Sequence, residues 1–361
     1  MADADTVAVY RDRAGEWTER RSGVTDDIEP FARRLRPEDR PVLDLGCGPG
    51  QYLASLPEGS IALDAVPELL AAVPSHSATA LVVRADLARL PFRRESLGAA
   101  WANKSLVHLP RADVPMALWD LHRSLRVDAP VALGLFAGDQ EFGPVPDDEF
   151  PGRRFSLWPE PLLRAVVEGA GFADVAITAR GDGRRGSYTV EARRGFSLAD
   201  TVGPGMRMLV VGLNPSILTA ERGIGFVRPG NRFWPAMLEA GLVERDRDPV
   251  AALRDHGIGM TNLALRPTRR ADEITAGEFR SGAARLDLLA EWLQPDVVCV
   301  VGITGWRTAV GLPKAVLGWQ ERSLGGRPTY VMPNPSGLNA HTNVADLAAH
   351  LRTAAAAAGR R

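Results

Sequence analysis

Short apolar runs that end in polar turns recur along this 361-residue sequence. Examples are PVLDLGCGPG, MRMLVVGLNPS and GRPTYVMPNPS, and segments of helical character follow them. Apolar runs of this length, bounded by turn residues, are typical of buried parallel strands. Their alternation with helices indicates an α/β fold, because parallel strands need a crossover segment between them.

The alternation breaks once, in the Gly- and Arg-rich segment 180–200. The length also favours two cores, because a single hydrophobic core rarely grows beyond about 250–300 residues. Each side of the break begins its own strand–turn–helix pattern. We therefore expect two α/β domains with mostly parallel sheets, residues 1–190 and 198–361, joined by a linker at 191–197.

Composition narrows the class of protein. Hydrophobic residues make up 45% and charged residues 24%, a normal globular balance. No apolar run approaches the roughly 20 residues of a membrane span, and the N-terminus lacks a signal-peptide core. The two cysteines, Cys47 and Cys299, lie far apart in the sequence. Two lone cysteines need several histidines to complete a zinc site, and the six histidines are scattered. We expect a cytoplasmic monomer with no disulfide, no structural metal and no membrane partner.

Charge differs between the halves. Residues 1–195 carry 24 Lys and Arg against 29 Asp and Glu, whereas residues 196–361 carry 19 against 15. The second half is therefore the better partner for a polyanion such as a nucleic acid.

The first half contains a glycine-rich turn that follows an apolar strand. This turn, in LDLGCGPG, carries three glycines, Gly46, Gly48 and Gly50. They allow a ligand to approach the backbone closely. Asp44 precedes them and suits an ammonium group better than a phosphate. Asp64 ends the next strand, where a carboxylate can hold two ribose hydroxyls, and Asp86 ends a third, where it can accept from an adenine amino group. The pattern favours a positively charged nucleoside cofactor; a helix-turn cap and a loop acid are the simpler interpretations of Asp44 and Asp86.

Residues from about 40 to 178 resemble class I S-adenosylmethionine-dependent methyltransferases. The resemblance rests on LDLGCGPG, ALDAVP, ADLARLPF and WANKSLVHL in that order. It implies a Rossmann-like fold and S-adenosylmethionine as cofactor. The implied binding residues are Asp44, Gly46, Gly48, Gly50, Asp64, Asp86 and Leu87. His108 stands where many small-molecule members carry a histidine, although a lone histidine is as often structural.

The sequence does not identify the methyl acceptor. DNA and protein amino-methylating enzymes of this fold carry an Asn-Pro-Pro-aromatic turn after the fourth strand, whereas this chain reads NKSL. Cytosine C5 methylation needs a cysteine nucleophile, and Cys47 lies in the cofactor turn. DNA base methylation is thus disfavoured. A small molecule and an RNA base stay open as methyl acceptors. A domain that binds the cofactor without catalytic activity also stays open.

The second half contains two Asn-Pro-Ser turns, each at the end of an apolar strand. They begin at Asn214 and Asn334, about 120 positions apart. Ligands bind at the carboxyl ends of parallel strands, so distant strand ends can share one pocket. Pro215 and Pro335 hold each preceding asparagine in extended geometry. We interpret the two turns as two walls of one site; ordinary turn chemistry is the alternative.

Nearby blocks point to a planar ligand within a nucleic acid. GFVRPGNRFW offers Phe226 for stacking, and GIGMTNLALRPT ends a third strand with the amide of Asn262. SGLNAH, at 336–341, presents Leu338 on a glycine turn, which suits insertion into a base stack.

Residues from about 197 to 350 resemble the mismatch-specific uracil-DNA glycosylases, including bacterial Mug and thymine-DNA glycosylases. The resemblance implies a three-layer α/β/α fold and double-stranded DNA with mismatched or damaged bases as partner, without a cofactor. It gives water positioning to Asn214, stacking to Phe226 and base contacts to Asn262. The remaining implied residues lie in the second turn and the strand-inserting loop: Asn334, Ser336, Gly337, Leu338, Asn339 and His341. Where the family often has glycine, this chain has Ser216, which puts tolerance of the thymine methyl group in question.

The residue types predict a slow hydrolase that leaves the DNA strand intact. A neutral Asn214 can orient a water molecule but cannot deprotonate it as a carboxylate would. A glycosylase that also nicks the strand needs an amine nucleophile, and Lys314 is the sole lysine in this half. The rival interpretation makes the first half a methyltransferase of a small molecule or RNA and the second a non-catalytic nucleic-acid-binding module.

Overall fold

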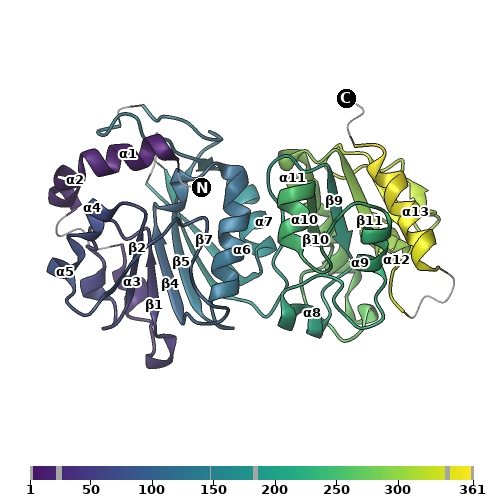
Figure 1. The fold of residues 1–361 in the computed structure, drawn as a ribbon, viewed down its shortest axis with the longest axis horizontal. Helices are drawn as coiled ribbons and strands as arrows, with labels where there is room; N and C mark the ends of the chain where they lie inside the picture. The colour runs from purple at the N-terminus through teal and green to yellow at the C-terminus, as the bar shows by residue number, and fades with distance from the viewer. Residues whose placement is uncertain (1–2, 22–26, 147, 182–185, 338–341, 359–361) are drawn as a thin grey trace. The chain divides into compact units, whose positions relative to one another are not determined.

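The protein is described here by a computed structural model that covers residues 3–21, 27–146, 148–181, 186–337 and 342–358 (Figure 1). The chain forms two compact units. Unit 1 comprises Met1–Arg164 and Phe172–Gly195, and unit 2 comprises Ala165–Gly171 and Phe196–Arg361. No helix in the described ranges is long and apolar enough to span a membrane.

Unit 1 is built on an eight-stranded sheet with the order β3-β2-β1-β4-β5-β8-β7, and β6 pairs with β5. The first five strands in this order are parallel, whereas β8 is antiparallel to both β5 and β7. The strands are β1 (Val42–Leu45), β2 (Ile61–Asp64), β3 (Leu81–Arg84), β4 (Ala99–Asn103), β5 (Pro130–Ala137), β6 (Leu157–Trp158), β7 (Phe172–Arg180) and β8 (Ser187–Arg194). All four residues of β1 are buried, which explains why this strand is almost wholly apolar.

Helices of unit 1 flank this sheet. They are α1 (Ala4–Asp12), α2 (Ala14–Arg21), α3 (Glu29–Ala32), α4 (Pro67–Leu70), α5 (Val73–His76) and α6 (Val114–Ser124). A further helix, α7 (Glu160–Gly169), is divided between the units: it begins in unit 1, and its residues from Ala165 onward belong to unit 2. Asp3 caps α1 by accepting a hydrogen bond from the Thr6 amide. Both α1 and α2 pack against α4, which follows β2. The N-terminal helices therefore lie near the carboxyl end of the strand that ends in Asp64.

Unit 2 contains a five-stranded sheet with the order β10-β9-β11-β13-β12. The first four are parallel and β12 is antiparallel. The strands are β9 (Met208–Gly212), β10 (Ile258–Asn262), β11 (Val297–Val301), β12 (Gly318–Trp319) and β13 (Thr329–Met332). Every residue of the four parallel strands is buried, and their sequences are largely apolar, with Thr261 and Asn262 of β10 and Thr329 of β13 as the polar residues.

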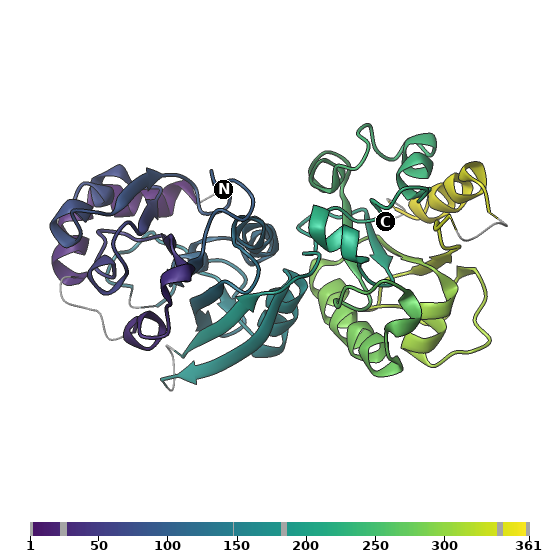
Figure 2. The ribbon, with the colours of Figure 1, turned by 90° about the horizontal axis from the view of Figure 1, so that it is seen from below.

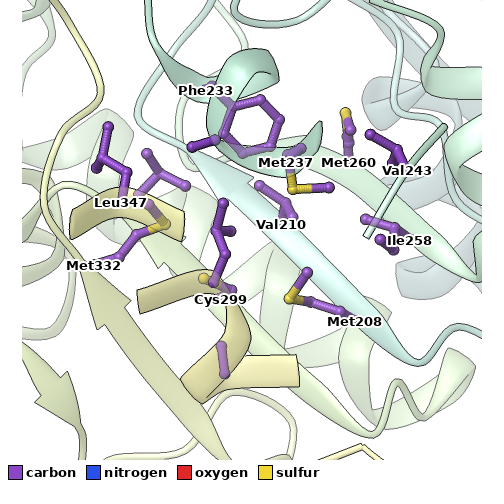
Figure 3. Packing of buried hydrophobic residues seen from close by; sticks show 14 of the residues in the cluster. Met208, Val210, Phe233, Met237, Val243, Ile258, Met260, Cys299, Met332 and Leu347 are labelled. Carbon is purple, nitrogen blue, oxygen red and sulfur yellow. The ribbon is translucent and has the colours of Figure 1, made fainter. Parts of the chain in front are cut away.

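The helices of unit 2 are seen in Figures 1 and 2, and they cover the sheet in packed pairs: α9 packs on α13, and α11 on α12. Their bounds are α8 (Ile217–Arg222), α9 (Phe233–Glu239), α10 (Pro249–His256), α11 (Ala276–Leu293), α12 (Ile303–Val310) and α13 (Val344–Ala355). Figure 3 shows the core between the sheet and the first pair, in which Val210 and Cys299 from the strands meet Phe233 of α9 and Leu347 of α13.

The connection between the units is shorter than the expected linker. Strand β8 continues to Arg194, and the last of the divisions between the units falls between Gly195 and Phe196. Most of the segment 191–197 is therefore part of the unit 1 sheet. The hydrogen bonds of β8 to β5 and β7 explain the difference, because local composition does not reveal such pairing.

Candidate functional site

Unit 1 contains a cavity of about 1060 Å³ at the strand ends. Of the residues expected to bind a cofactor, those that line the cavity are Gly46, Gly48, Asp64 and Leu87. Helices α1 and α2 contribute Tyr10 and Trp17 to the lining. The cavity is at the upper end of the size range for small-molecule pockets.

The glycine-rich turn and Asp64 hold each other in place. The Gly48 amide donates to Asp64 Oδ2 at 2.9 Å, and the Val66 amide donates to Oδ1 at 2.9 Å. Gly46 has a φ of +74°, and a Cβ there would lie 2.3 Å from Ser105 Cβ. Only glycine fits this turn, because both its backbone angle and the adjacent serine exclude a side chain.

Asp44 lies in β1 and is not in the cavity lining; it is only 1% exposed. Burial, followed by the charge of Asp64, raises the pKa of Asp44 to about 8. Its Oδ2 atom has no hydrogen-bond partner within the described ranges. A buried carboxyl group with one oxygen that lacks a partner, two residues before the glycine turn, fits a cationic group bound at that turn.

Gly50 and Asp86 also lie outside the lining of the cavity. Asp86 Oδ1 accepts a hydrogen bond from the Ala88 amide at 2.8 Å and so shapes its own loop. The adenine contact of Asp86 stays a prediction.

His108 lines the cavity, but both ring nitrogens have protein partners. Arg153 donates to the Tyr10 hydroxyl at 2.8 Å, and that hydroxyl lies 2.9 Å from His108 Nε2. His108 Nδ1 lies 2.9 Å from the Arg154 carbonyl, which can only accept, so Nδ1 carries the proton and Nε2 accepts from Tyr10. Burial lowers the pKa of His108 to about 4, which keeps the ring neutral. These contacts favour the structural interpretation of His108.

The N-terminal helices were not recognised as part of this site from the sequence. Tyr10 and Trp17 are seven residues apart, and their rings make an edge-on contact with a 5.1 Å centroid separation. Tyr10 lies on α1 and Trp17 on α2, so no single helical period connects them, and their contact depends on how the two helices meet.

In unit 2, Asn262 and Phe226 meet over Gly212. Asn262 ends β10 and pairs in register with Gly212, the last residue of β9. A Cβ on Gly212 would lie 2.4 Å from Asn262 Oδ1 and 3.4 Å from Phe226 Cζ. Glycine at this position therefore makes room for both side chains.

Phe226 is held in an unusual conformation. Its φ is +58°, which is strained for a residue with a side chain, and its ring stacks on Phe233 with a 4.0 Å centroid separation and an interplanar angle of 24°. Trp234 Nε1 donates to the Gly225 carbonyl at 2.8 Å and anchors the loop. Strain that is held by packing is common at functional sites.

Asn214 follows β9 by two residues, and its amide nitrogen faces three oxygens. Nδ2 donates to Thr268 Oγ1 at 2.7 Å, to the Pro215 carbonyl at 3.0 Å and to the Arg266 carbonyl at 3.3 Å. No protein group in the described parts of the chain donates to Asn214 Oδ1. The oxygen is therefore the atom that can accept a hydrogen bond from a ligand.

The second Asn-Pro turn follows β13 by two residues, at the same edge of the sheet. Asn334 Oδ1 accepts from the Ser336 amide at 2.9 Å and shapes the turn. The Arg232 amide donates to the Pro335 carbonyl at 3.0 Å, and its Nη2 donates to the Ser336 carbonyl at 2.8 Å. Loop 225–234 thus reaches both strand ends, through Phe226 and Arg232.

Part of the expected strand-inserting loop lies outside the described residues. A Cβ on Gly337 would lie 3.2 Å from the Gly230 carbonyl oxygen, so this glycine lies against loop 225–234. Leu338, Asn339 and His341 are not among the described residues, and their roles stay predictions.

Ser216 has a structural function that the sequence did not suggest. It caps α8: its Oγ accepts from the Thr219 amide at 3.2 Å and lies 2.9 Å from Thr219 Oγ1. The Ser216 hydroxyl is thus used within the helix terminus.

A buried ion pair supports the end of β10. Arg285 Nη1 donates to Asp200 Oδ2 at 2.7 Å, and Arg285 Nη2 donates to Thr261 Oγ1 at 2.9 Å and to the Asn262 carbonyl at 3.0 Å. These residues are 85 positions apart at most, and no local motif connects them. They fix the backbone that carries the Asn262 side chain.

Comparison with known proteins agrees with this division. Residues 42–128 match the family model described as a methyltransferase domain, and residues 199–356 match the uracil DNA glycosylase superfamily.

Among solved structures, an S-adenosylmethionine-dependent methyltransferase from Methanosarcina mazei is 16% identical, with a TM-score of 0.40, over 46% of this chain and 97% of that one. The Burkholderia thailandensis 1,6-didemethyltoxoflavin-N1-methyltransferase is 22% identical, with a TM-score of 0.40, over 53% and 86%. The methyltransferase from Mesorhizobium loti is 18% identical, with a TM-score of 0.37, over 45% and 96%. All three TM-scores lie below 0.5, so the domain assignment rests on the family models.

The expected fold class is confirmed, because both units are α/β with mostly parallel sheets. The chain carries a methyltransferase domain followed by a uracil DNA glycosylase superfamily domain.

Proposed function

We propose that unit 2 is a DNA glycosylase that hydrolyses the N-glycosidic bond of uracil or thymine mispaired with guanine. The observation that carries this proposal is the fixed orientation of the Asn214 amide, with its oxygen available at the strand edge that also holds Asn262 and Phe226. The superfamily match supports DNA as the substrate.

The mechanism follows from the residue types. A base must leave the helix before its sugar bond can be cleaved, which costs about a few kcal/mol and costs least at a mismatch. Phe226 would stack on the flipped base, and the Asn262 amide would bind its edge. Asn214 Oδ1 would accept a hydrogen bond from the attacking water. The water oxygen attacks C1′, and the C1′–N1 bond breaks with its electrons passing to the base. The attacking water loses one proton to the solvent, and the departing base anion takes up a proton from the solvent.

This arrangement makes hydrolysis slow and selective. Asn214 orients the water without removing its proton, so the rate depends on the stability of the departing base. Selectivity among base pairs should follow the free energy needed to flip the base out of the duplex, with U:G and T:G pairs preferred over U:A.

The strand should stay intact after base release. Lys314 is exposed and follows α12, which starts at the carboxyl end of β11 and returns the chain toward the opposite sheet edge. It is therefore poorly placed to form a Schiff base at the site. We propose a monofunctional enzyme.

For unit 1 we propose binding of S-adenosylmethionine and methyl transfer to a small molecule. The cofactor would supply a methyl group on a positively charged sulfur. Asp64 would hold its ribose, and the glycine turn would face its amino-acid portion. The Asp44 carboxyl, whose Oδ2 has no partner in the described ranges, would offset the positive charge by ionising when the cofactor binds. Residues of α1 and α2 in the cavity lining favour a small acceptor over a base in a duplex.

The test is base release from duplex oligonucleotides that carry U:G, T:G, U:A or C:G, with and without alkali. We expect abasic sites from U:G and no strand break before alkali. Binding to all duplexes without release would instead support the alternative, a nucleic-acid-binding module attached to a methyltransferase.

A further inference from the structure

The side chain of Thr268 makes the shortest hydrogen bond to the Asn214 carboxamide, with Oγ1 2.7 Å from Nδ2. Thr268 is 4% exposed and lies beside the first Asn-Pro turn. Its amide donates to the Pro215 carbonyl at 3.1 Å, and Thr268 forms an isolated parallel bridge with Ser216. The segment that follows β10 is thus joined to the segment that follows β9.

Counting protons settles the direction of each hydrogen bond. Thr268 Oγ1 lies 2.7 Å from the Arg270 carbonyl, which can only accept, so the hydroxyl proton goes there. The lone pairs of Oγ1 remain to accept from Asn214 Nδ2 at 2.7 Å. A flipped carboxamide would place Oδ1 against an oxygen that has no proton left to give.

The two carbonyl oxygens near Asn214 reinforce the same orientation but at longer range. They lie 3.0 and 3.3 Å from Nδ2, compared with 2.7 Å for Thr268. A carboxamide nitrogen has two protons for these three acceptors. The contact with Thr268 is the shortest of the three.

We propose that Thr268 is a positioning residue for base excision: it fixes the Asn214 carboxamide so that Oδ1 faces the attacking water. This inference rests on the proposed glycosylase function of unit 2. It assigns to Thr268 an effect that acts through Asn214 and makes no contact with DNA.

The variants Thr268→Val and Thr268→Ser separate this role from a structural one. Valine keeps the shape but removes the acceptor, whereas serine keeps the hydroxyl. We expect Thr268→Val to lower the single-turnover rate of uracil release from U:G about tenfold, the scale of one lost hydrogen bond, with unchanged DNA affinity. Thr268→Ser should keep most of the wild-type rate.

Thr329 offers a matched control. It is 1% exposed, and its Oγ accepts from the Leu324 amide at 3.0 Å and donates to the Arg327 carbonyl at 3.0 Å, but it starts β13 and so lies at the opposite sheet edge. Thr329→Val should reproduce any loss of stability without changing the rate of uracil release.

The decisive comparison uses Asn214→Ala and the double variant Asn214→Ala/Thr268→Val. If Thr268 acts through Asn214, then Thr268→Val costs nothing further once Asn214 is gone. An equal loss in both backgrounds, or a Thr268→Val rate equal to wild type, would overturn the inference. Absence of release by the wild type would instead defeat the proposed glycosylase function.

Discussion

The two units carry different polar side chains at equivalent ends of their parallel strands. Unit 1 has carboxyl groups, those of Asp44 and Asp64, on β1 and β2. Unit 2 has carboxamides, with Asn262 ending β10 and Asn214 and Asn334 two residues beyond β9 and β13. The architecture at the strand ends is shared, whereas the charge is not.

This difference matches the ligands proposed for the two sites. A buried carboxylate is costly unless a cation compensates it, which suits a positively charged cofactor. Close to DNA, however, a carboxylate would be repelled by phosphates, whereas a carboxamide offers hydrogen bonds without charge. The fold thus supplies the position, and the replacement of one carboxylate oxygen by an NH2 group matches the class of ligand that we propose for each site.

The largest expected effect comes from replacing a carboxylate of unit 1 with a carboxamide, the side chain found at the strand ends of unit 2. Asp64→Asn keeps the shape of the side chain but removes the charge and one acceptor. We expect binding of S-adenosylhomocysteine, measured by calorimetry, to weaken about 100-fold, because two charge-assisted hydrogen bonds are lost. Excision by unit 2 serves as the control and should not change. Unaltered affinity in this variant would remove Asp64 from the cofactor site.

Gly212→Ala tests the pairing of Asn262 with Phe226 in unit 2. The new methyl group would lie 2.4 Å from Asn262 Oδ1 and must displace that side chain. We expect at least about a tenfold loss in the rate of uracil release, the scale of one misplaced polar contact, while cofactor binding by unit 1 persists. A rate close to wild type would show that the Asn262 side chain does not contact the base.

Two exposed arginines near the unit 2 site test its preference for a polyanion. Arg228 lies two residues after Phe226, and Arg269 follows Thr268; neither pairs with a carboxylate in the described part of the chain. If each contacts one phosphate, Arg228→Ala and Arg269→Ala should each reduce the slope of log affinity against log salt by about 0.9. Arg207→Ala is the matched control, since Arg207 is exposed just before β9, at the opposite edge. Equal slopes for all three variants would place the DNA elsewhere.

The smallest expected effect is a pH dependence of unit 1. Asp44 has a pKa of about 8 in the folded chain, whereas an unfolded aspartate ionises near pH 4. The folded state therefore holds a proton that the unfolded state releases, and stability falls as the pH rises across this window. The side chain of the Asp44→Asn variant cannot ionise. The thermal stability of this variant, monitored by hydrogen exchange in β1, should therefore vary less between pH 5.5 and 8 than that of the wild type. Parallel curves would mean that Asp44 is ionised in the folded protein.

The sequence predicted the parts of each site that depend on strand ends. Parallel strands end at one edge, so Asn214, Asn262 and Asn334 follow from apolar runs and the turns after them. Cavity residues Gly46 and Asp64 follow from the same pattern. These are local signals, readable within ten residues.

The remaining contacts depend on tertiary packing and left no local signal. Thr268 reaches Asn214 across 54 positions, and Arg285 reaches Asp200 across 85. The carboxyl of Asp44 lies outside the cavity lining, and its contact with the cofactor stays a prediction. A strand pattern fixes where a side chain is, whereas its partners are set by the loops and helices that pack on it.

The most direct test of this account is the single-turnover rate of uracil release from a U:G duplex by the wild type and by Asn214→Ala. Loss of the oriented amide oxygen should lower the rate at least about 100-fold, with DNA binding and the binding of S-adenosylhomocysteine retained. A rate within about threefold of the wild type would show that Asn214 does not position the water, and the proposed site would then be wrong.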